Sequence, residues 1–274
     1  MIFLGLFTFY PMINLAYLSF FDYNIIKKPK FVGLENYKNL FFVKTDFLTA
    51  LANTCVYTVA VVVLLLLFAI LFALWMQNNT KLNRFAQTAL FTPHLVAMIS
   101  CGLIWAWLMN ENSGVLNAVL EFFEIPGLKW LNSSSTAMMS IVIVSVWKGI
   151  GYYALVVLSA LKAIPSEIYE AAALDNTGRL RKFFRITLPL LSPQLFFLLI
   201  TMTINSFKVF DTVRVMTGGG PGNSTDVLSY YIYRYAFQHF KVGYASAAGT
   251  VLMAMMMIMT ALYFKGLGKK VHYQ

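Results

Sequence analysis

Residues 161–193 read LKAIPSEIYEAAALDNTGRLRKFFRITLPLLSP, and this polar stretch lies between two long apolar runs. Pro165 is expected to end the preceding run, and Ser166 to cap a short helix whose first turn holds Glu167, where a carboxylate complements the helix dipole. A break at Gly178 then precedes a second, strongly basic turn of helix. The stretch therefore predicts a compact helical element outside the apolar part of the chain.

The rest of the chain is far more apolar than a soluble protein. Of its 274 residues, 59% are hydrophobic and 12% are charged, against about 45–50% and about 25% in an average soluble domain. One globular core of this length could not bury that surplus, so lipid must be part of the solvent. The alternating ten-residue segments of a membrane barrel are absent from the sequence, so we expect an all-α integral membrane protein.

Six apolar runs are long enough to cross a bilayer, which needs about 20 residues for each helix. They cover residues 1–20, 50–76, 86–109, 136–164, 188–210 and 245–267. An even number of spans places both termini on one side of the membrane. Lys and Arg are denser in the segments after the second, fourth and sixth runs than in the others, so charge predicts that both termini are cytoplasmic.

Several classes of function are disfavoured by the sequence. The net charge of +10 would suggest nucleic acid in a polar protein, but here Lys and Arg are expected in loops that hold the topology, so no nucleic-acid partner is expected. Cys55 and Cys101 fall inside apolar runs without metal-ligand spacing and are expected to be reduced packing residues. The sequence contains no H-E-x-x-H, no G-x-S-x-G and no paired Asp at membrane depth, so we expect no enzyme.

The stretch that opens this section resembles the EAA loop of permease subunits of binding-protein-dependent ABC importers. The likeness lies in Glu170-Ala171-Ala172, Asp175, Gly178 and Ile186-x-Leu188-Pro189. The preceding Leu161-x-x-Ile164-Pro165-x-Glu167-x-Tyr169 is similar to the carbohydrate branch of that family. Further similar blocks are FVGLENY at 31–37, Phe210-Asp211 with TGGGP at 217–221, and GYASA at 243–247, an arrangement closest to the first of the two unlike permeases of sugar and glycerol-phosphate importers.

The resemblance implies a single permease domain over residues 1–274, with a core bundle at about 50–267, a cytoplasmic coupling loop at 162–189 and an external loop at 211–244. It implies a type I importer bundle in the plasma membrane, forming the path for a sugar, polyol or glycerol phosphate delivered by an external binding protein. The implied partners are a second homologous permease and two cytoplasmic ATPase subunits, which would use ATP-Mg, so no cofactor is expected on this chain. The residues implied to dock on the ATPase are Glu170, Ala171, Ala172, Asp175 and Gly178.

Polar residues at membrane depth indicate where a solute could pass, because they are costly there unless they line a cavity. Sugars are bound by aromatic rings together with hydrogen-bonding groups. The candidate residues for the substrate path are Trp147, Lys148, Tyr152, Tyr153, Asn205, Lys208 and Asp211. For each of them, hydrogen bonding between helices, or snorkelling of the two lysines, is an alternative. His94, after Pro93, is expected at a kink rather than in a site.

The segment 218–225 reads GGGPGNST and superficially resembles a phosphate-binding loop. It lacks the Lys of that motif, so we expect a turn at the outer membrane face. A helical stripe follows, made of Val227, Leu228, Tyr231, Ile232, Tyr235 and Ala236. This stripe could contact an external binding protein or pack as a lid on the bundle. The main alternative function is an ion- or proton-coupled secondary transporter, which would place ionisable residues in the middle of several spans and would lack a docking loop.

Overall fold

The computed structural model describes residues 2–26 and 28–266, and most of these residues are helical. The first elements are short: α1 (Ile2–Leu4), the π-helical turn η1 (Gly5–Phe9), α2 (Tyr10–Leu18), β1 (Phe21–Asp22), β2 (Lys30–Phe31), α3 (Glu35–Lys38) and the π-helical turn η2 (Asn39–Val43). The two strands pair antiparallel, with Phe21 opposite Phe31.

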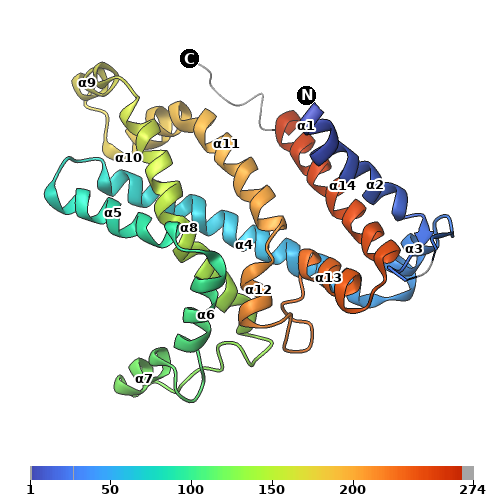
Figure 1. The fold of residues 1–274 in the computed structure, drawn as a ribbon. Helices are drawn as coiled ribbons and strands as arrows, with labels where there is room; N and C mark the ends of the chain where they lie inside the picture. Colours follow the sequence, from blue (N-terminus) through green and yellow to red (C-terminus); the bar gives the residue numbers. More distant parts are fainter. Residues whose placement is uncertain (1, 27, 267–274) are drawn as a thin grey trace.

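The remainder contains the long helices, together with several short ones (Figure 1). They are α4 (Thr45–Met76), α5 (Lys81–Leu95), α6 (Met98–Leu108), α7 (Val115–Phe122), α8 (Ala137–Lys162), α9 (Ser166–Leu174), α10 (Arg179–Lys182), the π-helical turn η3 (Phe183–Thr187), α11 (Leu188–Phe207), α12 (Asp211–Met216), α13 (Leu228–Tyr233), the π-helical turn η4 (Arg234–Gln238) and α14 (Val242–Gly266). The predicted end of the sixth span, Leu267, lies outside the described residues.

Four helical segments of the described chain are long and apolar enough to cross a membrane, namely α4, α8, α14 and the run Arg179–Met216. The pair α5 and α6 makes a fifth if it is one bent span. The run Ile2–Leu18, where the first span is predicted, is helical but shorter than these. A multi-pass helical membrane protein is therefore confirmed, while the number six stays a prediction.

The third predicted span, residues 86–109, is not one straight helix. α5 ends at Leu95, α6 begins at Met98, and the two axes are bent by 101°. The two residues between them have extended backbones, with φ −78° and ψ 141° at Val96 and φ −58° and ψ 140° at Ala97. Pro93 contributes, because it has no N–H to donate to the preceding turn of α5. The expected kink thus exists, two to three residues after His94.

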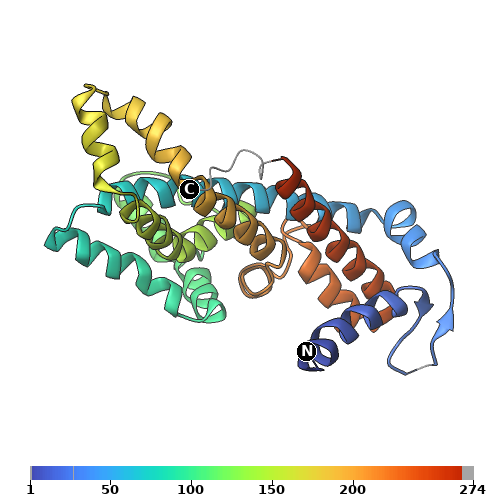
Figure 2. The same cartoon turned by 90° about the horizontal axis from the view of Figure 1, so that it is seen from above.

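The core of the bundle is built on α4, which packs along α8, with α5 and α11 completing the layer. Small side chains on α4 are fully buried there, including Ala69 and Ala73 at 0% exposure, and they let the neighbouring helices approach closely. α2 and α14 run side by side at one end of the molecule in both views (Figure 2). α14 also packs against α13, so the chain's last long helix joins the N-terminal helix to the segment before it.

One face of α4 carries large apolar side chains that the chain itself leaves exposed. They are Val56, Val59, Val63, Leu67 and Leu71, each at least half exposed. Residues spaced by three and four share a face of a helix, and an apolar face of this length is stable in lipid but not in water. This face therefore identifies the side of α4 that meets the bilayer or another membrane helix.

Candidate functional site

A cavity of about 290 Å³ lies among α4, α8, α11 and the break between α5 and α6. Its wall includes Tyr57, Val61 and Leu65 of α4; His94 and Met98 beside the break; Ser145, Lys148, Gly149 and Tyr153 of α8; Met202, Asn205 and Ser206 of α11; and Lys208 to Thr212 after it. Aromatic rings, hydroxyls, an amide and charged groups thus face one space inside an apolar bundle. Such a mixture can bind a small polar solute that a purely apolar wall would exclude.

Five of the seven residues predicted for the substrate path line this cavity: Lys148, Tyr153, Asn205, Lys208 and Asp211. Trp147 and Tyr152 are outside its wall. Trp147 instead meets Trp105 of α6 edge to face, with ring centroids 5.2 Å apart, and Tyr152 stacks on His94 at 4.6 Å. Successive residues of a helix point about 100° apart. Trp147, next to Lys148, and Tyr152, next to Tyr153, therefore lie on other sides of α8 than the one that faces the cavity.

The ammonium of Lys148 is bound by the backbone of the broken helix. Its Nζ donates to the carbonyl oxygens of Pro93 at 3.2 Å, His94 at 3.1 Å and Val96 at 2.6 Å. Lys148 therefore forms hydrogen bonds between α8 and the α5–α6 break in this structure.

Tyr57 and Ser145 are among the cavity residues that were not predicted from the sequence. The hydroxyl of Tyr57 donates to Oγ of Ser145 at 2.8 Å and joins α4 to α8 across the cavity wall. Both are polar residues within long apolar runs, which was the available signal. What the sequence could not supply was which of several such residues face the same space.

The segment predicted to couple the bundle to a partner projects from one end of the molecule, where α9 forms its tip (Figure 1). α9 begins at Ser166 with Pro165 at the capping position, and its cap forms without a side-chain bond, so Ser166 is the first helical residue rather than the cap. Glu167 lies in the first turn as expected. The break after α9 contains Asn176 in the left-handed conformation, with φ 49°.

Most residues expected to dock on a partner are open to the surroundings. Glu170, Ala171 and Asp175 are exposed, and a Cβ added to Gly178 would meet no atom within 4 Å. Ala172 differs, because it is only 6% exposed and faces the protein's own chain. The exposed surface of α9 therefore does not include every alanine of the run Ala171-Ala172-Ala173.

Tyr169 is one of the residues that attach α9 to the bundle. The hydroxyl of Tyr169 lies 3.3 Å from Oγ1 of Thr187, at the start of α11, and Nζ of Lys182 lies 5.9 Å from the centre of the Tyr169 ring. This contact joins α9 to the start of α11, the same helix that carries Asn205 to the cavity.

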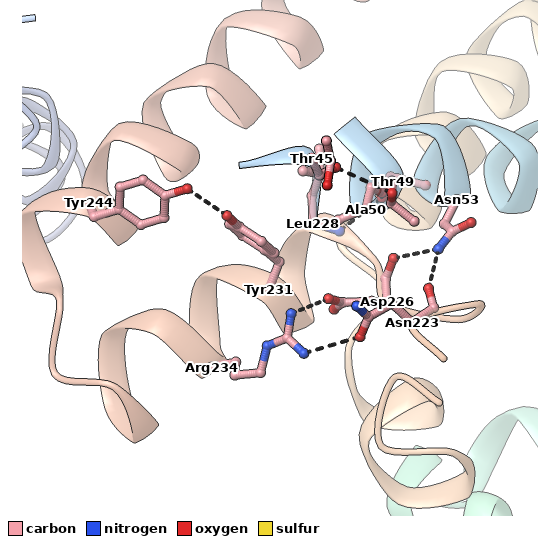
Figure 3. Close-up of polar contacts among 11 residues, drawn as sticks. Thr45, Thr49, Ala50, Asn53, Asn223, Asp226, Leu228, Tyr231, Arg234 and Tyr244 are labelled. Atoms are coloured by element: carbon pink, nitrogen blue, oxygen red, sulfur yellow. Dashed lines mark hydrogen bonds and ion pairs between the residues drawn. The ribbon is translucent and has the colours of Figure 1, made fainter. Parts of the chain in front are cut away.

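A polar cluster joins the loop before α13 to the first turns of α4 (Figure 3). We call Asn53, Asn223, Asp226 and Arg234 the α13 cluster. Asp226 is 0% exposed and ion-paired with Arg234, while Nδ2 of Asn53 donates to the carbonyl oxygens of Asn223 at 2.8 Å and Asp226 at 3.0 Å. Burial raises the pKa of Asp226 to about 6, against the opposing effect of the Arg234 charge.

The helical stripe that follows this loop is turned into the protein. Val227, Leu228 and Tyr231 are 0% exposed, and Tyr235 is 7% exposed. The backbone N–H of Leu228 donates to Oγ1 of Thr54 at 2.9 Å. The structure therefore favours lid packing for these side chains over contact with an external protein.

The GGGPGNST segment forms the predicted turn. Gly218, Gly219 and Gly222 have positive φ values, which only glycine adopts freely. Oγ1 of Thr225 donates to the carbonyl oxygen of Gly220 at 2.6 Å and closes the loop. Within residues 2–26 and 28–266, no group of three or more His, Cys, Asp and Glu side chains could hold a metal ion.

Comparison with known proteins identifies the family. The model of the family described as "Binding-protein-dependent transport system inner membrane component" matches residues 66–272, and the chain belongs to this family. It is a permease component of an ABC importer, embedded in the membrane, and not an enzyme.

Two relatives illustrate how far the similarity extends. The sulfoquinovosyl glycerol transport system permease protein SmoG of Agrobacterium fabrum is 35% identical over 270 residues, covering 96% of this chain and 86% of the relative. The sn-glycerol-3-phosphate transport system permease protein UgpA of Escherichia coli is 36% identical over 248 residues, covering 89% and 83%. Each alignment thus includes both the cavity and the segment around α9.

The fold is shared with a solved transporter. A chain in the crystal structure of a bacterial alginate ABC transporter, in complex with an alginate pentasaccharide-bound periplasmic protein, superposes with a TM-score of 0.85. The superposition covers 96% of this chain and 88% of the other at 23% sequence identity. At this identity the likeness establishes the arrangement of the helices.

Proposed function

We propose that this chain forms one half of the translocation path for a sugar, polyol or glycerol phosphate. The observation that carries the proposal is the cavity, where Tyr57, Tyr153 and Asn205 offer rings, hydroxyls and an amide inside an apolar bundle. Hydroxyl-rich solutes bind to this combination of stacking and hydrogen-bonding groups. The relatives that transport sulfoquinovosyl glycerol and sn-glycerol 3-phosphate support the same class of solute.

In this proposal the chain is one permease domain of six spans with both termini in the cytoplasm. Its core bundle covers about 50–267, its coupling loop 162–189 and its external loop 211–244. A second, homologous permease completes the path, and a solute-binding protein delivers the solute from outside. The structural relative bound to a periplasmic protein supports an assembly of this kind.

The energy for transport comes, in this proposal, from two cytoplasmic ATPase subunits that bind ATP-Mg. Glu170, Ala171, Asp175 and Gly178 are available for docking, and the buried Ala172 supports α9 from behind. ATP binding would draw the two coupling helices together and turn the bundle from inward-facing to outward-facing. This requires a bundle with two stable states whose balance the nucleotide changes.

Purification and transport together test the proposal. An affinity-tagged chain, isolated from its native membrane, should carry with it a second permease and an ATPase. Uptake of radiolabelled maltose, glucose and sn-glycerol 3-phosphate should be compared between cells with and without the gene, each with a protonophore and with depleted ATP. Loss of uptake on ATP depletion alone supports an ABC importer, whereas loss with the protonophore at unchanged ATP would identify a secondary transporter.

A further inference from the structure

The break between α5 and α6 leaves backbone carbonyl groups at the end of α5 without a partner in the helix. The last carbonyl groups of any helix have no partner within that helix. In a bilayer no water is available to satisfy them, so irregular backbone at membrane depth survives only where protein groups or a wet cavity replace water. Residues 93–97 are in this situation, because Val96 and Ala97 are extended and α5 has already ended at Leu95.

Lys148 donates hydrogen bonds to three of the carbonyl groups at this break. An ammonium group has three N–H donors, and three carbonyl oxygens of the break lie within hydrogen-bonding distance of Nζ. The positive charge also lies at the C-terminal end of α5, where the helix dipole stabilises cations. With its three donors used in this way, Lys148 has none left for a solute in the cavity that it lines.

The residues around Lys148 hold both sides of the break. On the α5 side, Gly151 lets the backbone approach so closely that a Cβ there would collide with the carbonyl oxygen of Leu90. Also on that side, the ring of Tyr152 stacks on His94 at 4.6 Å with 9° between the planes. On the α6 side, Trp147 meets Trp105 at 5.2 Å.

We propose that residues 147–152 of α8 form a clamp that fixes the bend of the α5–α6 segment. Within this clamp Lys148 is a positioning residue for the cavity wall rather than a ligand of the solute. The wall residues that depend on it are His94, at the end of α5, and Met98, the first residue of α6. The effect of the clamp on transport rests on the proposed function, but the clamp itself does not.

Hydrogen–deuterium exchange of the chain, purified with its native partners and without solute, tests the clamp. Lys148→Met should raise the exchange rate of peptides covering residues 93–101 by roughly tenfold or more, since charge-assisted bonds to the break are lost. Peptides from α13 and α14 should exchange as in the wild type. Lys148→Arg, which keeps charged donors, should restore much of the protection.

Lys208→Met is the matched control, because Lys208 is a second lysine that lines the same cavity, but it is exposed and follows the end of α11. It should leave exchange at residues 93–101 unchanged. If Lys148→Met does not accumulate in the membrane, Gly151→Ala gives the same test without removing a charge. It pushes α5 away from α8 and should raise exchange in the same peptides.

Transport separates a positioning role from a binding role. For the member of the maltose, glucose and sn-glycerol 3-phosphate panel that the wild type takes up, Lys148→Met should lower the maximal rate and leave the half-saturating concentration unchanged. Wild-type exchange at residues 93–101 in Lys148→Met, or in Gly151→Ala, would overturn the clamp. Because exchange is measured without transport, this result is distinct from a failure of the proposed function.

Discussion

The side-chain amide of Asn53 donates to the carbonyl oxygen of Asn223 at 2.8 Å, across 170 residues of sequence. The same nitrogen reaches the carbonyl oxygen of Asp226 at 3.0 Å. One amide group on α4 therefore holds the loop that leads into α13. Because this loop carries the buried Asp226, the contact also fixes the position of the ion pair with Arg234.

Asn53→Ala should destabilise the protein by about 1–3 kcal/mol, because two backbone carbonyls lose their donor in a partly buried place. Thermal unfolding in detergent measures this change. Thr49→Ala, one turn earlier on α4, is the control, since the Thr49 hydroxyl is exposed and bonds only within its own helix, to the carbonyl of Thr45. Equal melting temperatures for the two variants would show that the Asn53 contacts contribute nothing.

Stability should depend on Asp226 between about pH 4 and pH 6. The pKa of this carboxyl is raised from 3.8 to about 6 in the folded protein, so the folded state binds more protons than the unfolded state in this window. Lowering the pH from about 6 to about 4 should raise the free energy of unfolding of the wild type by up to about 3 kcal/mol relative to that of Asp226→Asn.

Unfolding of the two proteins at a series of pH values measures the difference. Well above the folded-state pKa of about 6 the carboxyl is ionised in both states, and the difference should become constant. A difference that stays constant from pH 7 down to pH 4 would contradict the raised pKa.

Replacing Gly178 should separate folding from coupling. A side chain there meets open space and φ is −62°, so Gly178→Leu should change the stability by no more than about 0.5 kcal/mol. If an ATPase docks at this position, the added side chain should abolish solute-stimulated ATP hydrolysis in the reconstituted complex. Normal hydrolysis in Gly178→Leu would remove this residue from the docking surface.

In Glu170→Lys, solute should likewise no longer stimulate ATP hydrolysis, while insertion of the chain into the membrane should be unchanged. The carboxylate is exposed on α9 and offers a charge to a basic partner, so its reversal turns attraction into repulsion. Co-purification of the ATPase with the tagged chain is the measurement. Glu167→Lys, in the first turn of the same helix, is the matched control and should retain more of the ATPase.

The bond between Tyr57 and Ser145 should couple α4 to α8 by about 0.5–1.5 kcal/mol. A double-mutant cycle with Tyr57→Phe and Ser145→Ala, followed by thermal unfolding, isolates this term. Strictly additive effects would mean that the two hydroxyls do not interact. The single variants also test whether the bond is needed for uptake.

Many local features could be predicted from the sequence. The helices α4, α8 and α14 were predicted because each is a long apolar run, and the turn at Gly218 because glycines cluster there. The break in the third span was predicted only as a kink near His94, because Pro93 marks the weakened turn but not the residues at which the backbone becomes extended. The cap of α9 was predicted at Ser166 but lies at Pro165, and a difference of one residue is the usual uncertainty of a helix end.

The sequence by itself determined that this chain is a helical membrane protein with a polar segment at 161–193, since composition and spacing along the chain are local properties. Only the tertiary structure decided what the polar residues contact. Lys148 reaches the carbonyls of the α5–α6 break, Trp147 and Tyr152 lie outside the cavity, and Asn53 meets Asn223. These contacts depend on how helices far apart in sequence approach one another, which no local pattern encodes.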